Sequence, residues 1–288
     1  MENILTVNNI CKSYGKKKVL DDVSIRIPKG SIYGLIGKNG AGKTTLMRII
    51  TSLQEPQSGS VELGKARIGA LIDSPAFYAN LSAKENMTAH FKTLGLTSYD
   101  AIDELLKLVK LDDTGSKAAG KFSFGMKQRL GIAIALSGNP DIVLMDEPIN
   151  GLDPQGIIEI REIILDIYKQ KGTTFIISSH LLDELSKIAT DYAFIDHGRI
   201  IKEISAKELI EGSGKSYSAT VSDASKVCKV LDDEGKRYKL ISDKKIRIED
   251  EMTLAGMSDI AERCGVELIE FTEHDTSLEG YFINLVEG

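Results

Sequence analysis

The chain has 288 residues, of which 42% are hydrophobic and 27% are charged. This composition is ordinary for a globular protein and excludes disorder as the main state. The formal net charge of −6 leaves no basic excess to neutralise a phosphate backbone, so we expect no nucleic-acid partner. Cys11, Cys228 and Cys264 have no metal-binding spacing and indicate reduced thiols. We expect neither a signal peptide nor a membrane span, because no apolar run approaches about 18 residues.

Strands alternate with helices over the first two thirds of the chain. Val23, Ile25 and Ile27 alternate with polar residues, which predicts a half-buried strand. Asp153-Pro154 predicts a helix start, with Asp as N-cap and Pro at the first helical position. This alternation is typical of an α/β domain with a largely parallel sheet. Further buried strands are predicted at Ser31–Gly37, Ile142–Met145, Thr173–Ser178 and Tyr192–Asp196, and a helix at Lys43–Ser52.

Two capping boxes, at Ser82 with Glu85 and at Ser205 with Glu208, predict helix starts. The second box begins a short helix that should end near Gly212. The sequence EGSGKS follows and has the composition of a linker. We therefore predict two domains, residues 1–212 and residues 213–288.

The last 70 or so residues have a pattern of their own, in the order strand, helix, strand, strand, helix, strand. This order predicts a small α+β domain with the ferredoxin-like arrangement. An amphipathic pattern predicts one more helix at Ser277–Val286. The six earlier elements are predicted at Tyr217–Val221, Ala224–Glu234, Tyr238–Ser242, Ile246–Glu249, Met252–Cys264 and Val266–Thr272.

A glycine-rich motif lies between the first apolar strand and the helix that follows it. Gly37–Thr44 reads GKNGAGKT and matches G-x-x-x-x-G-K-[ST]. Glycines allow backbone N–H groups to converge on phosphate oxygens, and the helix N-terminus adds positive potential. Lys43 would contact the β- and γ-phosphates, and the Thr44 hydroxyl would bind Mg²⁺. The motif predicts a site for the phosphates of a nucleotide.

Two carboxylates end a second apolar strand, which reads IVLMDE over Ile142–Glu147. At the end of a strand both side chains can reach a site formed by the loops. Asp146 would hold Mg²⁺, and Glu147 would orient or deprotonate the attacking water. About 100 residues after the phosphate motif, this pair predicts nucleotide hydrolysis rather than binding alone.

These motifs and four others resemble the ATP-binding subunit of an ABC transporter, over about residues 4–210. SFGMKQR at Ser123–Arg129 is similar to the LSGGQ-like signature, although Phe124 and Met126 replace the usual glycine and glutamine. GLDP at Gly151–Pro154 is similar to the D-loop, His180 to the switch histidine, and Tyr14 to the aromatic residue that stacks on adenine. The resemblance implies a P-loop NTPase domain with a helical subdomain.

The resemblance also implies a head-to-tail homodimer that sandwiches two ATP molecules. The signature helix of one chain would present Ser123 and Gly125 to the γ-phosphate held by the other chain. His180 would hydrogen-bond the γ-phosphate and the attacking water. The implied nucleotide contacts are Tyr14, Gly37, Asn39, Gly40, Ala41, Gly42, Lys43, Thr44, Thr45, Ser123, Gly125 and Asp153; the implied catalytic residues are Lys43, Glu147 and His180, and the implied Mg²⁺ ligands are Thr44, Asp73 and Asp146.

Asp73 departs from the usual pattern, because most ABC ATPases have glutamine at this position. An acidic residue here, usually glutamate, resembles the transporters of bacitracin resistance and lantibiotic immunity. The tracts IGALIDSPAFYANLSAKENM and FSFGMKQRLGIAIAL are similar to that subfamily. The alternative is a neutral change of Gln to Asp in an exporter of some other cargo.

The resemblance implies a separate membrane permease that docks near Asp73–Asn86 and a location on the cytoplasmic face of the cell membrane. Its cargo would be a peptide antibiotic, or otherwise an ion, lipid, polysaccharide or drug. A non-transport ABC ATPase fits less well, because the chain has one set of motifs and no long coiled-coil insertion. A regulatory module without turnover also fits less well, because Glu147 and His180 are both present.

Overall fold

A computed structural model of the chain describes residues 2–212 and 216–274. The chain divides into two compact units, Met1–Ala206 and Lys207–Gly288, which are described separately here. The helix predicted to end near Gly212 is present as α7 (Ala206–Gly212). The division between the units falls at the start of this helix, whereas the predicted domain boundary follows residue 212. The helix predicted at Ser277–Val286 lies outside the described residues.

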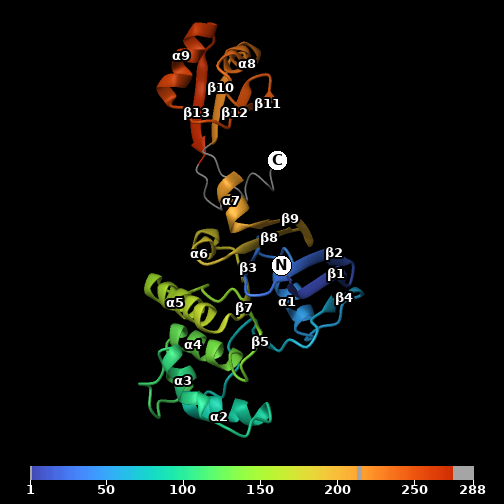
Figure 1. Ribbon diagram of the computed structural model, residues 1–288, viewed down its shortest axis with the longest axis vertical. Coiled ribbons are helices and arrows are strands. Elements are labelled where there is room, and N and C mark those ends of the chain that lie inside the picture. Colours follow the sequence, from blue (N-terminus) through green and yellow to red (C-terminus); the bar gives the residue numbers. More distant parts are fainter. Residues whose placement is uncertain (1, 213–215, 275–288) are drawn as a thin grey trace. The chain divides into compact units, whose positions relative to one another are not determined.

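A six-stranded sheet with the order β5-β6-β7-β3-β8-β9 forms the centre of the first unit (Figure 1). The apolar runs of β3, β6 and β7 are buried along their whole length, which explains why they read as continuous hydrophobic segments. The first five strands are parallel, and β9 joins the edge antiparallel to β8. The strands are β3 (Ile32–Ile36), β5 (Ile68–Leu71), β6 (Ile142–Asp146), β7 (Thr174–Ser179), β8 (Asp191–Asp196) and β9 (Arg199–Ser205).

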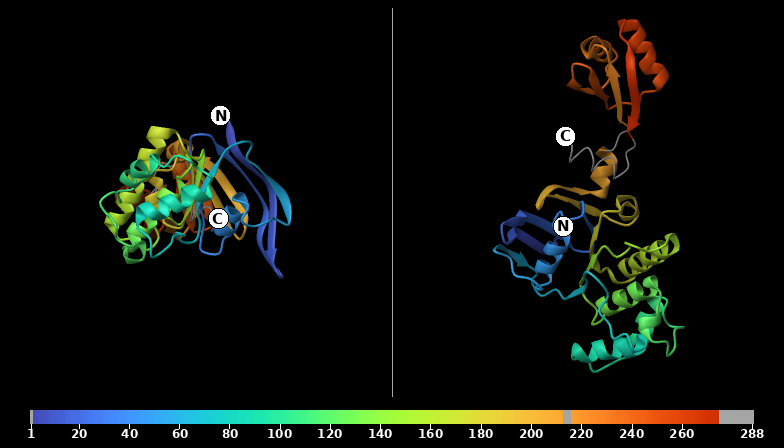
Figure 2. Two further views of the ribbon diagram at one scale, coloured as in Figure 1. Left: turned by 90° about the horizontal axis from the view of Figure 1, so that it is seen from below. Right: turned by 180° about the vertical axis from the view of Figure 1, so that it is seen from behind.

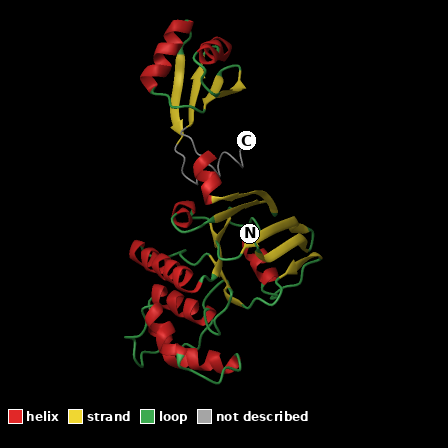
Figure 3. Ribbon diagram, viewed as in Figure 1, coloured by secondary structure: helices red, strands yellow, loops and turns green. Residues whose placement is uncertain are grey.

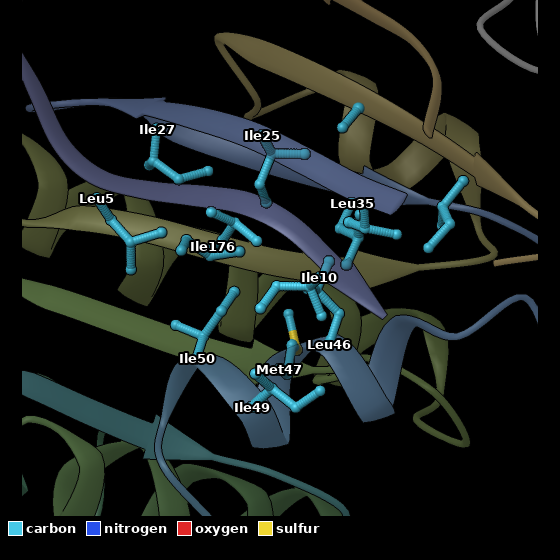
Figure 4. Packing of buried hydrophobic residues seen from close by; sticks show 14 of the residues in the cluster. Leu5, Ile10, Ile25, Ile27, Leu35, Leu46, Met47, Ile49, Ile50 and Ile176 are labelled. Atoms are coloured by element: carbon cyan, nitrogen blue, oxygen red, sulfur yellow. The ribbon is translucent and has the colours of Figure 1, made fainter. Parts of the chain in front are cut away.

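A second, antiparallel sheet has the order β2-β1-β4, built from β1 (Asn3–Tyr14), β2 (Lys17–Pro28) and β4 (Ser58–Glu62) (Figure 2). The alternation of Val23, Ile25 and Ile27 is confirmed within β2, where all three are buried. Their side chains pack toward helix α1 (Lys43–Ile50) and the central sheet, in one core with Leu5, Ile10, Leu35, Leu46, Met47 and Ile176 (Figure 4).

The remaining helices of the first unit include a run of neighbours, with α5 beside α4 and then α3 and α2 toward one end (Figure 3). α5 follows the acidic strand and is capped by Asp153 with Pro154 in its first turn, as predicted, and the short α6 follows β7. α2 lies at one end of the unit (Figure 1) and begins with the predicted capping box of Ser82 and Glu85. The helices are α2 (Ala83–Thr93), α3 (Ala101–Leu108), the 3₁₀ turn Ala119–Lys121, α4 (Phe124–Ala135), α5 (Pro154–Lys171) and α6 (Leu182–Ser186).

The second unit contains a four-stranded antiparallel sheet with the order β11-β12-β10-β13. Its core includes fully buried Leu231, Ile246 and Met257, from helices and strands alike. The predicted succession strand, helix, strand, strand, helix, strand is present. The elements are β10 (Ser216–Val221), α8 (Ala224–Asp233), β11 (Tyr238–Ser242), β12 (Lys245–Ile248), α9 (Leu254–Cys264) and β13 (Leu268–His274). In the described part of the chain, no helix is both long enough and apolar enough to cross a bilayer.

Candidate functional site

The glycine-rich loop runs from the end of β3 into α1, as the motif predicts. Gly42 caps α1 with φ 112°, a conformation that glycine adopts without steric cost. A Cβ on Gly37 would lie 2.3 Å from the carbonyl oxygen of Ile195, so the loop passes too close to β8 for any side chain. The Lys43 ammonium is buried and donates to the carbonyl oxygens of Gly37 (2.6 Å) and Lys38 (3.3 Å). The loop therefore holds a buried cation at a helix N-terminus.

Three loops meet where β3, β7 and β6 end side by side. β7 lies between the other two, and Ser179 is in register with Ile36 of β3 while Ser178 is in register with Asp146 of β6. Parallel strands place their carboxyl ends at the same edge of a sheet. The glycine-rich loop, the acidic pair and His180 are therefore brought together from three distant parts of the sequence.

The three predicted catalytic side chains form one cluster. Glu147 Oε2 lies 2.8 Å from His180 Nδ1, and Glu147 Oε1 lies 3.2 Å from Lys43 Nζ. That Oε1 atom is buried and has no hydrogen bond of good geometry to any described residue. Glu147 has φ 49°, a backbone region that non-glycine residues rarely occupy. A polar ligand that enters between this carboxylate oxygen and the Lys43 ammonium could hydrogen-bond to both.

Thr44 and Asp146 have the donor atoms that Mg²⁺ prefers. The Thr44 hydroxyl donates to Asp146 Oδ2 at 2.7 Å, across the gap between α1 and β6. No group of three or more His, Cys, Asp or Glu side chains with metal-binding geometry occurs among the described residues. Mg²⁺ is usually held by one or two protein oxygens together with substrate phosphates and waters, so this donor pair fits it.

A hollow at the glycine-rich loop is the place where a nucleotide would lie, but Tyr14 is not among its lining residues. The Tyr14 hydroxyl donates to Gln54 Oε1 at 2.7 Å, and the ring is 47% exposed. Gly37 and Ala41 are buried and do not line the hollow either. The lining residues are Lys17, Val19, Asn39, Gly40, Gly42, Lys43, Thr44, Thr45 and Glu147.

The signature segment and the D-loop adjoin each other within one chain. Ser123 caps α4 by accepting from the Met126 N–H (3.3 Å), and Asp153 caps α5. The exposed Phe124 ring lies beside Gly151, where an added Cβ would meet it at 3.6 Å. The contacts of Ser123, Gly125 and Asp153 with a nucleotide held by a second chain stay predictions.

Asp73 is engaged by Arg48 of α1. Arg48 Nη2 donates to both carboxylate oxygens, at 2.7 and 2.8 Å. The hydrogen bond to this carboxylate raises the pKa of Arg48 above its ordinary value. Asp73 is about half exposed and has φ 63°. Its role as a Mg²⁺ ligand therefore stays a prediction, and it would require this ion pair to open.

The sequence analysis missed four residues of this region: Lys17, Val19, Arg48 and Ser178. Ser178 is fully buried and its hydroxyl donates to Asp146 Oδ1 at 2.5 Å. The signal was available, because Ser178 is a polar residue that directly follows the apolar residues Phe175–Ile177 in a predicted buried strand. The other three gave no such signal, since their contacts depend on how distant segments fold together.

Comparison with known proteins gives the family. Residues 20–150 match the model of the family described as "ABC transporter". An uncharacterised ABC transporter ATP-binding protein of Bacillus subtilis, YcbN, is 40% identical over 100% of this chain and 98% of its own. The bacitracin transport ATP-binding protein BcrA of Bacillus licheniformis is 36% identical over 100% and 99%.

Two further matches cover about three quarters of the chain. The lantibiotic transport ATP-binding protein SrtF of Streptococcus pyogenes is 44% identical over 72% of this chain and 94% of its own. Among solved structures, MJ1267, an ATP-binding cassette of an ABC transporter in its ADP conformation, is 27% identical over 74% of this chain and 95% of its own, with a TM-score of 0.66. The chain thus belongs to the ATP-binding proteins of ABC transporters, the ATPase subunits of these systems.

Proposed function

We propose that this subunit drives a separate membrane permease that exports peptide antibiotics or confers immunity to them, of the bacitracin or lantibiotic type. The cluster of Lys43, Glu147 and His180 carries the ATPase part of the proposal, because it unites phosphate binding, a general base and a proton partner in one site. The similarity to bacitracin transport BcrA over the full chain supports the cargo class. The acidic residue Asp73 agrees with it, because an acidic residue at this position resembles the same transporters.

In the proposed reaction, Lys43 turns from Glu147 to the β- and γ-phosphates when ATP binds. Glu147 Oε1, released from Lys43, then accepts the proton of the water that attacks the γ-phosphate. His180, already held by Glu147 Oε2 at 2.8 Å, orients that carboxylate and donates toward the γ-phosphate. Thr44 and Asp146 would hold Mg²⁺, which when bound neutralises phosphate charge. The backbone N–H groups of the glycine-rich loop bind the remaining phosphate oxygens.

The working unit in this proposal is a head-to-tail homodimer. Ser123 and Gly125 begin α4, and a helix N-terminus favours an anion. In one chain this segment adjoins the D-loop, so both would face the nucleotide held by the second chain. ATP binding would close the dimer, and hydrolysis would reopen it and reset the permease.

The permease would dock over Asp73–Asn86, at the cytoplasmic face of the cell membrane. The Arg48–Asp73 ion pair lies at the start of this segment, and Tyr78 within it is 63% exposed. A helix of the permease could use both the charges and the aromatic ring. We also propose that the second unit is ferredoxin-like, on the grounds of its element order and its strand order β11-β12-β10-β13.

Growth inhibition tests the proposed cargo. A strain that lacks the gene is complemented with the wild type or with Glu147→Gln and challenged with bacitracin and several lantibiotics. The proposal expects sensitivity to some of these peptides, which only the wild type reverses. If purified wild type hydrolyses ATP but no peptide distinguishes the strains, the cargo belongs to another class, and the permease that co-purifies with this subunit becomes the guide to it.

A further inference from the structure

The Ser178 hydroxyl connects the two acidic residues of the site. Ser178 Oγ donates to Asp146 Oδ1 at 2.5 Å and accepts the backbone N–H of Glu147 at 2.9 Å. We propose that Ser178 is a positioning residue, whose hydroxyl fixes the metal-binding carboxylate of Asp146 and the backbone of the general base Glu147 at the same time. This inference rests on the proposed roles of those two residues.

The position of Ser178 in the sheet makes this bridge possible. β7 lies between β3 and β6, and Ser178 is in register with Leu35 on one side and with Asp146 on the other. Ser178 has no exposed surface. Burying a hydroxyl without hydrogen-bond partners costs free energy, and the two hydrogen bonds to the acidic pair offset that cost.

The hydrogen-bond count shows what the hydroxyl contributes. A serine hydroxyl has one proton, which Ser178 gives to Asp146 Oδ1. The other oxygen of Asp146, Oδ2, accepts from Thr44. The carboxylate is therefore held at both oxygens, one bond from the phosphate loop and one from β7. Without the Ser178 hydroxyl, Oδ1 would lose its donor in a side chain that is only 7% exposed, and the carboxylate could rotate.

The second bond of the hydroxyl acts on Glu147. This residue has φ 49°, in a region that costs free energy for a residue with a side chain. Its N–H is shared between the Ser178 hydroxyl (2.9 Å) and the Ser178 carbonyl oxygen (3.2 Å). Both acceptors belong to one residue, so Ser178 holds the backbone that aims the Glu147 side chain at Lys43 and His180.

The test compares Ser178→Ala with a matched control, Thr174→Val, in the full chain. Thr174 is a fully buried hydroxyl residue at the other end of β7, and its Oγ1 accepts from the Gly30 N–H at 2.9 Å. Both variants lose one buried hydroxyl from the same strand, but only Ser178 bonds to the acidic pair. The readouts are the Mg²⁺ concentration that half-saturates binding of a non-hydrolysable ATP analogue, the affinity for that analogue in EDTA, and kcat.

Ser178→Ala should raise the half-saturating Mg²⁺ concentration and lower kcat by about 10- to 100-fold, the usual effect of losing a hydrogen bond to a metal-binding group. Affinity in EDTA should stay at the wild-type value, since phosphate binding by Lys43 does not depend on Asp146. Thr174→Val should match the wild type in all three. Ser178→Thr, which keeps the hydroxyl, should recover most of the loss.

The inference is overturned if Ser178→Ala, folded by circular dichroism, has the Mg²⁺ requirement and kcat of Thr174→Val. If Ser178→Ala does not fold, Ser178→Cys keeps the shape of the side chain with a somewhat larger atom, provides only a weak donor, and carries the same comparison. Failure of the proposed cargo gives a different result, because the peptide panel would then show no difference while these readouts stay as expected. Failure of the role proposed for Glu147 is also distinct, because Glu147→Gln would then keep the wild-type kcat.

Discussion

At the scale of single residues, we predict that the cluster around Glu147 determines turnover. Glu147→Gln removes the general base but keeps the size of the side chain, so it should lower kcat by about 10²- to 10⁴-fold. ATP binding should persist, because the glycine-rich loop and Lys43 are intact. Phosphate release and binding of a fluorescent ATP analogue measure the two effects separately.

The matched control for this prediction is Glu162→Gln. Glu162 is a surface carboxylate of α5 whose partner is Lys110, at 2.9 Å. Its loss should leave both readouts unchanged. Wild-type turnover in Glu147→Gln would remove Glu147 from the proposed mechanism.

The Arg48–Asp73 ion pair decides between two roles of Asp73. If Asp73 is a Mg²⁺ ligand, the Asp73→Asn variant should need a higher Mg²⁺ concentration to bind the non-hydrolysable ATP analogue. With both oxygens on Arg48, we expect Asp73→Asn and Arg48→Gln to leave the Mg²⁺ requirement of the isolated subunit within a few-fold of the wild type. A ten-fold rise in Asp73→Asn alone would establish the metal role.

The same pair should contribute little to folding. Its two side chains are 38% and 52% exposed, and ion pairs of this kind contribute about 0–1 kcal/mol. A double-mutant cycle on urea unfolding should therefore give a coupling of less than about 1 kcal/mol.

At the scale of elements, the contribution of the α2 capping box can be tested through the free energy of unfolding and its dependence on pH. The Ser82 hydroxyl accepts from the Glu85 N–H (3.3 Å), and Glu85 accepts from the Ser82 N–H (2.7 Å). Ser82→Ala should lower the free energy of unfolding by about 1 kcal/mol. Thr88→Ala, at a half-buried position of the same helix that takes no part in the cap, is the control and should change this free energy less.

The backbone hydrogen bond from Ser82 lowers the pKa of Glu85 below its usual value. A carboxyl whose pKa is lower in the folded state stabilises that state above the unfolded pKa, near 4.5. This contribution should vanish as the pH falls from there through the folded pKa. The free energy of unfolding should be higher for the wild type than for Glu85→Gln at pH 7, and this difference should disappear in acid.

Elements with a regular pattern were predictable, and those with a broken pattern were not. In the second unit, apolar spacing and turn residues placed all six elements within two residues of their observed bounds. β1 was missed because irregular pairing, at Val7/Ile10 among other positions, interrupts the alternation along the strand. β4 and β9 were missed because most of their residues are exposed or half-buried, so they carry little apolar signal.

The same distinction holds for the site. Lys43, Asp146 and Glu147 could be predicted, because each belongs to a motif that follows an apolar strand. The bond from Tyr14 to Gln54 and the pair of Arg48 with Asp73 could not, since neither spacing nor composition brings those residues together. Sequence motifs therefore predict the site residues in the loops at the carboxyl edge of the parallel sheet. The contacts between other segments depend on tertiary packing.

At the scale of the whole molecule, the chain is two units with separate hydrophobic cores. The core of the first unit surrounds Leu35 and Ile176, and that of the second surrounds Ile246 and Met257. The residues that bind nucleotide and hydrolyse it in the proposal all belong to the first unit. The head-to-tail dimer must therefore be tested with variants in that unit.

Two variants can test whether each ATP site is formed by two chains, with the glycine-rich loop from one chain and the signature segment from the other. Lys43→Ala removes phosphate binding, and Gly125→Asp places a carboxylate where the second chain's γ-phosphate would lie. Gly125→Asp should fold, because a Cβ there meets Leu152 at an ordinary 3.5 Å and a carboxylate is favourable in the first turn of a helix. Each variant alone should therefore be folded and inactive.

In a mixed dimer, the intact glycine-rich loop of the Gly125→Asp chain faces the intact signature of the Lys43→Ala chain, which restores one site. Random pairing of equal amounts makes half of the dimers mixed, so the mixture should recover roughly a quarter of wild-type sites. Phosphate release by the mixture, compared with each variant alone at the same total concentration, is the measurement. If each chain completed its own site, mixing two inactive variants would restore nothing, and the head-to-tail arrangement would be wrong.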